Sequence, residues 1–515
     1  MYRLLFPITI AIAFISNGYP QTVQPAKRTI SGLVSAADGS GPLEGVLVAV
    51  RGDKITSGSQ QDGMYYIEVP AADSVLVFSR DEYQTTEVRL CANTEYNVVL
   101  KPGQSAAPAP GSPAPPAPSP ASGHPTAPAP FSALGSWRGL FELRPGVEVP
   151  FNFDIRADKN GQLKAFFRNG DESFEGGPVR QTADSLFISL DQFDNALAFQ
   201  IGEGPLTGVF YKQDRTGTPL PVRIEPGSTT RFADKGEAPA GNLSGTYDVT
   251  FTSADGKVEK VVGVFQQRGS KLAGTFLRVT GDSRYLEGIV EGNDFYLSSF
   301  YGSGPAYYKG HFTADGQITG ENIGARGSVA FQGVKNDSAA LPDAYKLTYL
   351  KPGYTSFDFS LPDIDGNSIS LKDKKFQNKV VIVTIGGTWC PNCVDETSFL
   401  APWYAENRNR GVEVVSIQYE RKTDTAFVRK VLTRMRDRYA IQYTQVFGGI
   451  ADKQVVASSL PALNTFLAFP TTIFIDKQGR VARIHTGYSG PATGIYYQKF
   501  LQEFNGEIDA LLAAK

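Results

Sequence analysis

The chain has 515 residues, so several domains are expected rather than one core. Its formal net charge is −2 and it contains no long basic run, which makes nucleic acid and anionic membrane surfaces poor partners. Its three cysteines are too few for a disulfide framework to hold the fold.

The first residues have the outline of a secretory signal peptide. Arg3 precedes an apolar run from Leu4 to Ile15, and small residues follow as far as Gly18. The run is too short to span a bilayer comfortably. We predict a signal peptide over 1–18. The protein is then exported to the periplasm or cell envelope, where thiols do not stay reduced without help.

Residues 28–101 consist of short β-rich runs separated by turns, which predicts a β-sandwich. The segment resembles the carboxypeptidase-regulatory-like domain, a small non-catalytic β-sandwich. The resemblance rests on Gly32-Leu33-Val34, Pro42-Leu43-Glu44-Gly45-Val46 and Asp62-Gly63-Met64-Tyr65. We interpret Cys91 as a small buried side chain on a strand, although an odd cysteine in an exported protein is unusual.

A proline-rich stretch follows this first domain. Eleven of the 33 prolines of the chain lie between positions 102 and 130. Such a composition cannot build a core and favours an extended polyproline II conformation. We therefore predict a linker over 102–131.

Residues 132–338 contain an internal repeat. The Gly-Asp pair at Gly170-Asp171 recurs at Gly281-Asp282, and the repeat spacing of about 106–111 residues suits duplicated β domains over 132–238 and 239–338. Short strands punctuated by glycine indicate an antiparallel sandwich or barrel. The shared Gly-Asp pair could belong to a ligand site, but we interpret it as a turn, because tight turns need these residues. The ligand of this region stays open.

The segment 345–515 alternates strands with helices, which predicts an α/β domain with its own core. The basic residues of 429–438 are interpreted as a solvated helix face. Apolar strands are expected at 380–385, 412–418 and 471–476, and helices at 425–439 and 496–514.

The motif Cys390-Pro391-Asn392-Cys393 stands between a predicted buried strand and a predicted helix. Cys390 then lies just before the helix or in its first turn, where backbone N–H groups and the helix dipole favour a thiolate. Cys393 comes one turn later, close enough to form a disulfide. In such a pair one cysteine attacks and the other resolves the mixed disulfide.

Other uses of the pair are less favoured. A zinc site needs a second Cys/His pair, and the sequence has none. Attachment of a c-type haem needs histidine after the second cysteine, where Val394 stands. A purely structural disulfide across four residues would constrain little of the chain. We therefore predict redox chemistry, with no metal, no cofactor and no haem attached to this chain.

Residues 355–510 resemble the TlpA-like thiol-disulfide oxidoreductases of the thioredoxin superfamily. The resemblance implies a thioredoxin fold in which Cys390 is the nucleophile, Cys393 resolves, and the two form a disulfide. It rests on the stretches Phe359–Gly366, Lys379–Val383, Trp389–Cys393, Ala468–Asp476 and Gly490–Gly494.

The resemblance also assigns roles around the pair. Pro470 is expected to form a cis peptide bond, so that Phe469, together with Trp389, binds the substrate peptide. Glu396, one helical turn beyond the pair, is expected to exchange protons with the thiols. Thr384 stands where thioredoxin has a buried aspartate, which leaves more of the proton handling to Glu396 or to water. Peroxiredoxins share the entry hairpin, but their catalytic threonine stands three residues before the cysteine, whereas Thr388 stands two before Cys390. Peroxidase activity is therefore disfavoured.

The sequence thus predicts a multidomain protein: a β-sandwich, a duplicated antiparallel β region and a C-terminal α/β thioredoxin fold. Its expected activity is thiol–disulfide exchange with other exported proteins, acting as a reductase supplied by an unidentified membrane thiol donor. The alternative is an envelope binding or scaffold protein whose redox domain is subsidiary. Reductase or oxidase direction, natural substrate and oligomeric state stay open.

Overall fold

The computed structural model describes residues 27–515 except positions 39–40, 44–45, 52–55, 60–62, 71–74, 81–82, 92, 94–95, 103–130, 215, 234 and 515. The predicted signal peptide at 1–18 and nearly all of the predicted linker at 102–131 lie outside the described residues. The chain divides into two compact units, Met1–Thr126 and Ala127–Lys515. Among the helices of the described part, none has the length and apolar character needed to cross a membrane.

The first unit contains two small sheets over one apolar core that includes Tyr65 and Phe78. Their strand orders are β4-β1-β7 and β3-β2-β5-β6. Alternate residues of β5 are buried, as expected for a strand with one face on a core. The likeness to carboxypeptidase-regulatory-like domains stays a prediction. The strands are β1 (Lys27–Ala36), β2 (Leu47–Val50), β3 (Thr56–Gly58), β4 (Met64–Pro70), β5 (Val75–Ser79), β6 (Thr86–Arg89) and β7 (Val98–Leu100).

Cys91 lies outside the strands of this unit and is exposed. The prediction of a buried cysteine on a strand is therefore wrong. Strand β6 ends at Arg89, and it is Leu90, 1% exposed, that turns into the core. The Cys91 backbone N–H donates to the Tyr96 hydroxyl at 2.6 Å.

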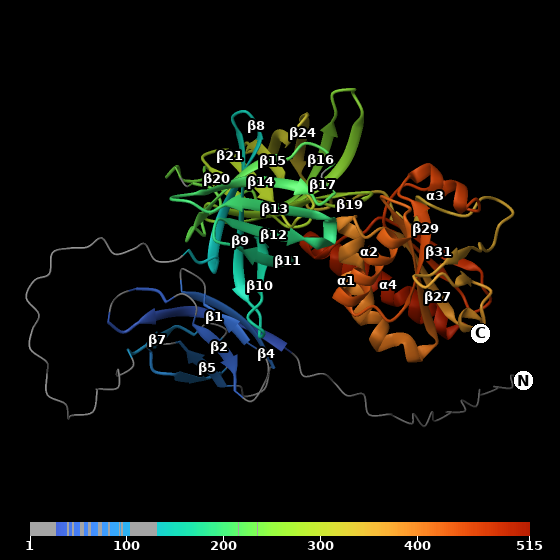
Figure 1. The fold of residues 1–515 in the computed structure, drawn as a ribbon, viewed down its shortest axis with the longest axis horizontal. Coiled ribbons are helices and arrows are strands. Elements are labelled where there is room, and N and C mark those ends of the chain that lie inside the picture. The colour runs from blue at the N-terminus through green and yellow to red at the C-terminus, as the bar shows by residue number, and fades with distance from the viewer. Residues whose placement is uncertain are drawn as a thin grey trace, which may run out of the picture. The chain divides into compact units, whose positions relative to one another are not determined.

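The second unit begins with a closed antiparallel barrel, drawn in teal and green in Figure 1. Its interior is rich in phenylalanine, and Gly139 leaves room for one of these rings, because a Cβ there would lie 2.1 Å from the Phe151 ring. The short 3-10 helix η1 (Asp191–Phe193) joins two of its strands. The strands are β8 (Gly135–Arg144), β9 (Val147–Ala157), β10 (Leu163–Asn169), β11 (Glu172–Gln181), β12 (Ser185–Leu190), β13 (Asn195–Gln200), β14 (Leu206–Lys212) and β15 (Leu220–Pro226).

A nine-stranded antiparallel sheet follows, with a separate core. The first strand of its order, β17, also pairs with β18, which stands next to the last strand, β19. Both modules are thus antiparallel, as predicted for 132–338, whereas their origin by duplication and the boundaries 132–238 and 239–338 stay predictions. The strands are β16 (Gly245–Thr252), β17 (Val258–Arg268), β18 (Lys271–Arg278), β19 (Gly281–Asp282), β20 (Leu286–Glu291), β21 (Asp294–Ser299), β22 (Ala306–Phe312), β23 (Gln317–Gly324) and β24 (Gly327–Lys335).

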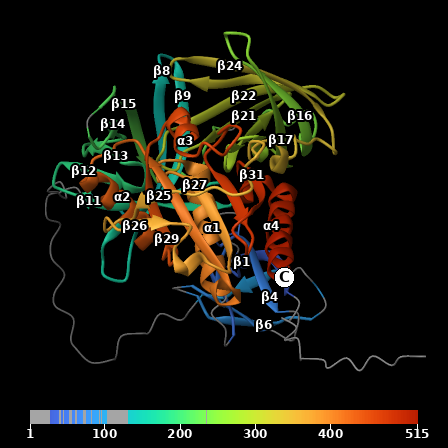
Figure 2. The same ribbon diagram turned by 90° about the vertical axis from the view of Figure 1, so that its right-hand side faces the viewer.

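The C-terminal part has the predicted α/β architecture. Its sheet has the order β29-β28-β27-β30-β31, in which β30 alone runs antiparallel to the other strands. Every residue of β27 is buried, which explains its unbroken apolar sequence. Figure 2 shows α1 and α4 beside this sheet. Its main elements are β25 (Ser360–Pro362), β26 (Ser368–Ser370), β27 (Val380–Gly386), α1 (Pro391–Asn407), β28 (Val412–Glu420), α2 (Thr425–Tyr439), β29 (Thr444–Ile450), α3 (Lys453–Ser459), β30 (Thr471–Ile475), β31 (Val481–Thr486) and α4 (Ile495–Ala513).

One core cluster of the α/β domain also contains side chains of the barrel. Phe174 of β11 and Phe193 of η1 belong to the same buried cluster as Val394 and Tyr404 of α1. A second cluster, from Phe357 to Ile484, contains residues of this domain alone, so the expectation that 345–515 has a core of its own is correct, and its folding alone stays a prediction. The barrel contributes large apolar side chains to one side of α1, where a free thioredoxin fold would meet water.

The basic face of α2 likewise meets the barrel. Both terminal nitrogens of Arg434 lie 3.1 Å from Asp194 Oδ1, and Arg438 donates to the Glu175 carbonyl at 2.5 Å. Arg438 also lies over the Phe174 ring. The interpretation of 429–438 as a solvated helix face is wrong for these two arginines, because both bind the barrel at the interface between the domains.

Candidate functional site

The cysteine pair stands at the junction of β27 and α1. Cys390 is the N-cap residue of α1, and its carbonyl accepts a hydrogen bond from the Val394 N–H at 3.0 Å. Both thiols are free, with Cys390 6% and Cys393 3% exposed. The helix begins here because Pro391 occupies its first turn, where a missing N–H costs nothing. The predicted position of the pair is therefore correct.

The cysteines face a second chain segment that comes from before β30. The Phe469–Pro470 peptide bond is cis, as expected. Cys390 Sγ lies 3.6 Å from the Phe469 carbonyl oxygen. Trp389 packs edge-on against the Phe469 ring at 5.5 Å, and its indole N–H donates to the Tyr419 carbonyl at 2.9 Å. The structure thus brings Trp389, Phe469 and Pro470 to the side of Cys390.

Glu396 lies inside the fold, one turn beyond the pair. It is 6% exposed, and the Thr472 hydroxyl donates to its Oε1 at 2.5 Å. Burial raises the pKa of Glu396 to about 7, against the effect of that hydrogen bond. Burial, the neighbouring Cys390 and then Glu396 raise the pKa of Cys393 well above its ordinary value. A buried acid that titrates near neutrality therefore stands beside a thiol that holds its proton tightly.

A second buried acid, which the sequence reasoning missed, holds the loop before Cys390. Glu420 at the end of β28 accepts hydrogen bonds from the Thr388 N–H and hydroxyl, both at 2.9 Å. Burial raises its pKa to about 7. Gln192 of the barrel donates to the Thr388 carbonyl at 2.9 Å. The only sign of this role in the sequence is that a charged residue, Glu420, ends a strand whose other residues are mostly apolar.

The β region also touches the motif itself. The Asn392 side chain donates to the Asp282 carbonyl at 3.3 Å, and Asp282 Oδ2 accepts from the Gly490 N–H at 2.5 Å. Arg284 forms a 2.7 Å ion pair with Asp395 of α1. The interpretation of Gly281-Asp282 as a turn is wrong: the turn is at positions 279–280, and the pair forms strand β19, which is packed between the two domains. Nothing in the repeat marks Asp282 or Arg284 as neighbours of the cysteines.

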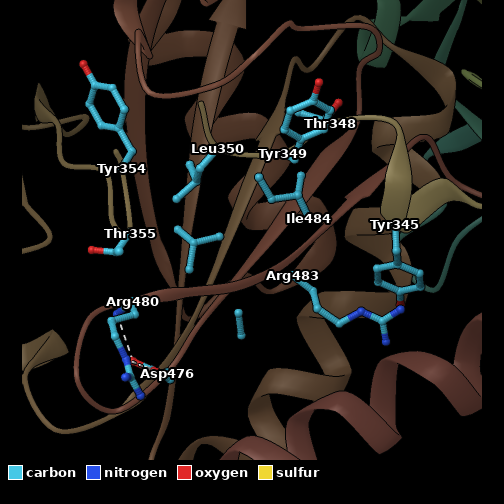
Figure 3. A pocket seen from close by; sticks show the side chains of 12 residues that line it. Tyr345, Thr348, Tyr349, Leu350, Tyr354, Thr355, Asp476, Arg480, Arg483 and Ile484 are labelled. Carbon is cyan, nitrogen blue, oxygen red and sulfur yellow. Dashed lines mark hydrogen bonds and ion pairs between the residues drawn. The ribbon is translucent and has the colours of Figure 1, made fainter. Parts of the chain in front are cut away.

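A surface hollow lies elsewhere and is not lined by the cysteine pair. It has a volume of about 470 Å³ and opens beside β31. Figure 3 shows that Arg483 points toward Tyr345, over whose ring it lies at 3.8 Å, while Arg480 pairs with Asp476. Its lining comes from 345–355 and 476–484, so it takes no part in the thiol site.

The comparisons with known proteins concern the C-terminal region. Residues 352–484 match the model of the AhpC/TSA family. The thiol-disulfide oxidoreductase ResA of Halalkalibacterium halodurans is 29% identical over 142 residues, which are 27% of this chain and 69% of that protein. ResA of Geobacillus kaustophilus is 30% identical over 141 residues, 27% of this chain and 72% of that protein.

A solved thiol-disulfide oxidoreductase from Bacteroides fragilis aligns with 20% identity and a TM-score of 0.23, over 29% of this chain and 98% of its own. The residues matched to the family model, 352–484, include the cysteine motif, Pro470 and nearly all of the central sheet. By this C-terminal region the chain belongs to the TlpA-like thiol-disulfide oxidoreductases of the thioredoxin superfamily.

Proposed function

We propose that the enzyme reduces disulfides of other exported proteins through Cys390 and Cys393. The observation that carries this proposal is the placing of Cys390 Sγ at the N-terminus of α1, 3.6 Å from the Phe469 carbonyl. A substrate strand that pairs beside Phe469 brings its own sulfur to Cys390. The second thiol, Cys393, lies one turn deeper and resolves.

The exchange takes two steps. The Cys390 thiolate attacks one sulfur of the substrate disulfide, a Cys390–substrate bond forms, and the substrate S–S bond breaks to release a thiolate that takes up a proton. Cys393 then loses its proton and attacks the Cys390 sulfur. The substrate leaves as a dithiol with two electrons, and the enzyme keeps the Cys390–Cys393 disulfide. A membrane dithiol donor then reduces this disulfide for the next cycle.

Glu396 supports the second step as a proton acceptor. Cys393 needs to lose a proton before it attacks, and its pKa is raised. A carboxyl whose pKa is about 7 is partly ionised at neutral pH and can therefore accept this proton and return it when the disulfide is reduced again. Trp389, Phe469 and Pro470 bind the substrate chain on the other side of the pair.

Substitution of single cysteines tests these roles. Cys390→Ser is expected to abolish exchange with a model disulfide, because it removes the nucleophile. Cys393→Ser is expected to accumulate a mixed disulfide on Cys390, which peptide mass spectrometry locates. Cys91→Ser, at the exposed cysteine, is the control and should leave exchange unchanged. An adduct on Cys393 in the Cys390→Ser protein, with continued turnover, would reverse the roles.

The direction of exchange is tested by the reduction potential of the pair, measured by equilibration with glutathione buffers. A reductase needs a potential below that of the glutathione couple in an oxidising compartment, roughly −200 mV. A more positive potential would overturn the reductase assignment and make the protein an oxidant.

A further inference from the structure

A buried arginine of the nine-stranded sheet β16–β24, the second β module, lies against the first turns of α1. The Arg284 side chain is 4% exposed and forms ion pairs with Asp395 of α1, at 2.7 Å, and with Glu172 of the barrel. Its Nη1 also donates to the Pro391 carbonyl at 3.4 Å. Pro391 and Asp395 lie on either side of Cys393 in the chain, so Arg284 fixes the helix segment that carries the pair.

The position of Arg284 is itself fixed by its surroundings. The guanidinium lies over the rings of Tyr301, at 4.5 Å, and Phe174, at 5.3 Å. Burial alone would lower its pKa, but Asp395 and Glu172 raise it overall, so the side chain stays charged. A charged group held between rings and carboxylates has little freedom to move.

Asp282 makes the second contact, with the residues between the cysteines. Its carbonyl accepts from Asn392, its Oδ2 accepts from the Gly490 N–H, and its Oδ1 accepts from the Arg284 N–H at 2.6 Å. Gly281 fits tightly here, since a Cβ at this position would lie 2.0 Å from Asn392 Nδ2. Asp282 thus joins the motif, the Gly490 loop and Arg284 in one network.

We propose that Arg284 and Asp282 are positioning residues of the redox site, through which the second β module sets the reduction potential of the Cys390–Cys393 pair. The proposal rests on the proposed function of the pair. A helix N-terminus stabilises a thiolate only if its N–H groups stay aimed at the sulfur. Stabilising the reduced form makes a pair more oxidising. Loss of the network, and of the Arg284 charge, should therefore make the pair more reducing.

The test uses the full chain and two matched variants. Arg284→Met removes the charge and the hydrogen bonds. Arg231→Met is the control, because Arg231 is equally buried, 3% exposed, but its contacts are with Ser298, Asn169 and Glu287 of the β region. Both variants are equilibrated with glutathione buffers, and the oxidised fraction is measured by mass spectrometry after alkylation.

Arg284→Met is expected to shift the exchange equilibrium about tenfold toward the disulfide form, which is ~30 mV for a two-electron couple. Arg231→Met should stay within about twofold of the wild type, since its environment is the β region alone. Arg284→Lys keeps the charge but loses the planar guanidinium with its several donors, so it should shift the reduction potential less. An unchanged potential in Arg284→Met, or equal shifts in both Met variants, would overturn the proposal.

Hydrogen exchange gives a readout that needs no redox activity. Amides in the first turns of α1 are expected to exchange about tenfold faster in Arg284→Met and unchanged in Arg231→Met. If the wild-type pair does not equilibrate with glutathione, the proposed function fails, while the exchange rates still decide whether Arg284 positions the helix. Equal rates in the two variants would contradict that role.

Discussion

The two Gly-Asp pairs of the β region share a sequence but differ in local structure and in surroundings. Asp171 in the barrel is exposed, whereas Asp282 in the following sheet is 9% exposed and binds the redox domain. A Cβ on Gly170 would meet its nearest atom at 3.9 Å, but one on Gly281 would meet Asn392 at 2.0 Å. The first pair is the turn between β10 and β11, whereas the second forms β19, and only docking against α1 gives the second pair a role beside the thiols.

The largest difference in the free energy of unfolding is expected between variants of the two aspartates. Asp282→Ala should lower the free energy of unfolding by about 3 kcal/mol, because it leaves the buried N–H groups of Gly490 and Arg284 without an acceptor. Asp171→Ala should change it by less than about 0.5 kcal/mol, as for other exposed sites. Urea denaturation followed by circular dichroism measures both. Equal losses would show that the two aspartates are equivalent.

Helix α1 offers the same contrast between a buried and an exposed glutamate. The pKa of Glu396 is raised from 4.5 to about 7, so the folded state binds more protons than the unfolded state between these values. The contribution of Glu396 to the free energy of unfolding is therefore lost as the pH rises through about 7. The loss between pH 5 and 8 is about 2 kcal/mol. Glu396→Gln should remove that loss.

Thermal unfolding across this pH range measures the effect of Glu396→Gln, and Glu406→Gln on the exposed face of the helix is the control. The Glu396 variant should gain stability over the wild type at pH 8 but not at pH 5. Parallel pH profiles for the wild type and Glu396→Gln would exclude a carboxyl that titrates near neutrality in the folded protein, and with it the proton acceptor.

The two glycines should differ by a smaller amount. Gly281→Ala is expected to cost about 2 kcal/mol, because the residue has φ +136° and the new Cβ meets Asn392. Gly170→Ala, at φ +57° with no atom closer than 3.9 Å to the new Cβ, should cost about 1 kcal/mol. Combining Gly281→Ala with Asn392→Ala should recover part of the loss in denaturation experiments. No recovery would mean that backbone strain alone sets the cost.

The smallest contrast lies on α2. Arg434→Met breaks a partly buried pair with Asp194 of the barrel and should cost about 1 kcal/mol. Arg436→Met, whose partner is its neighbour Asp437 on the exposed face, should change the free energy of unfolding by a few tenths of a kcal/mol. Both are measured by urea denaturation. A larger loss for Arg436→Met would contradict the interface role of Arg434.

Much of the redox domain could be predicted from the sequence. Strands β27 and β28 are apolar runs buried on both faces, and α2 has the range that its periodicity indicates, Thr425–Tyr439. The cysteine spacing and the strand before it placed the pair at a helix N-terminus. Local signals were sufficient here because burial in a central sheet and helix geometry act over a few residues.

The contacts across the domains could not be predicted in this way. Cys91 stands two residues beyond the end of β6, next to the buried Leu90, and Arg434 looks like any basic residue on a helix face. Glu172 and Arg284 meet although 112 positions separate them. Such pairs depend on how whole modules dock, and their local sequence carries no record of the partner.

The sequence by itself determined the chemistry of this protein: two thiols one helical turn apart, a proline before the neighbouring strand, and a carboxyl on the helix behind them. Tertiary structure alone decided that Phe174, Asp282 and Arg284 of the β region would stand against that helix. The physical reason is the range of the forces involved. Backbone geometry and hydrophobic periodicity are fixed by near neighbours, whereas ion pairs and packing between modules are fixed only when distant surfaces meet.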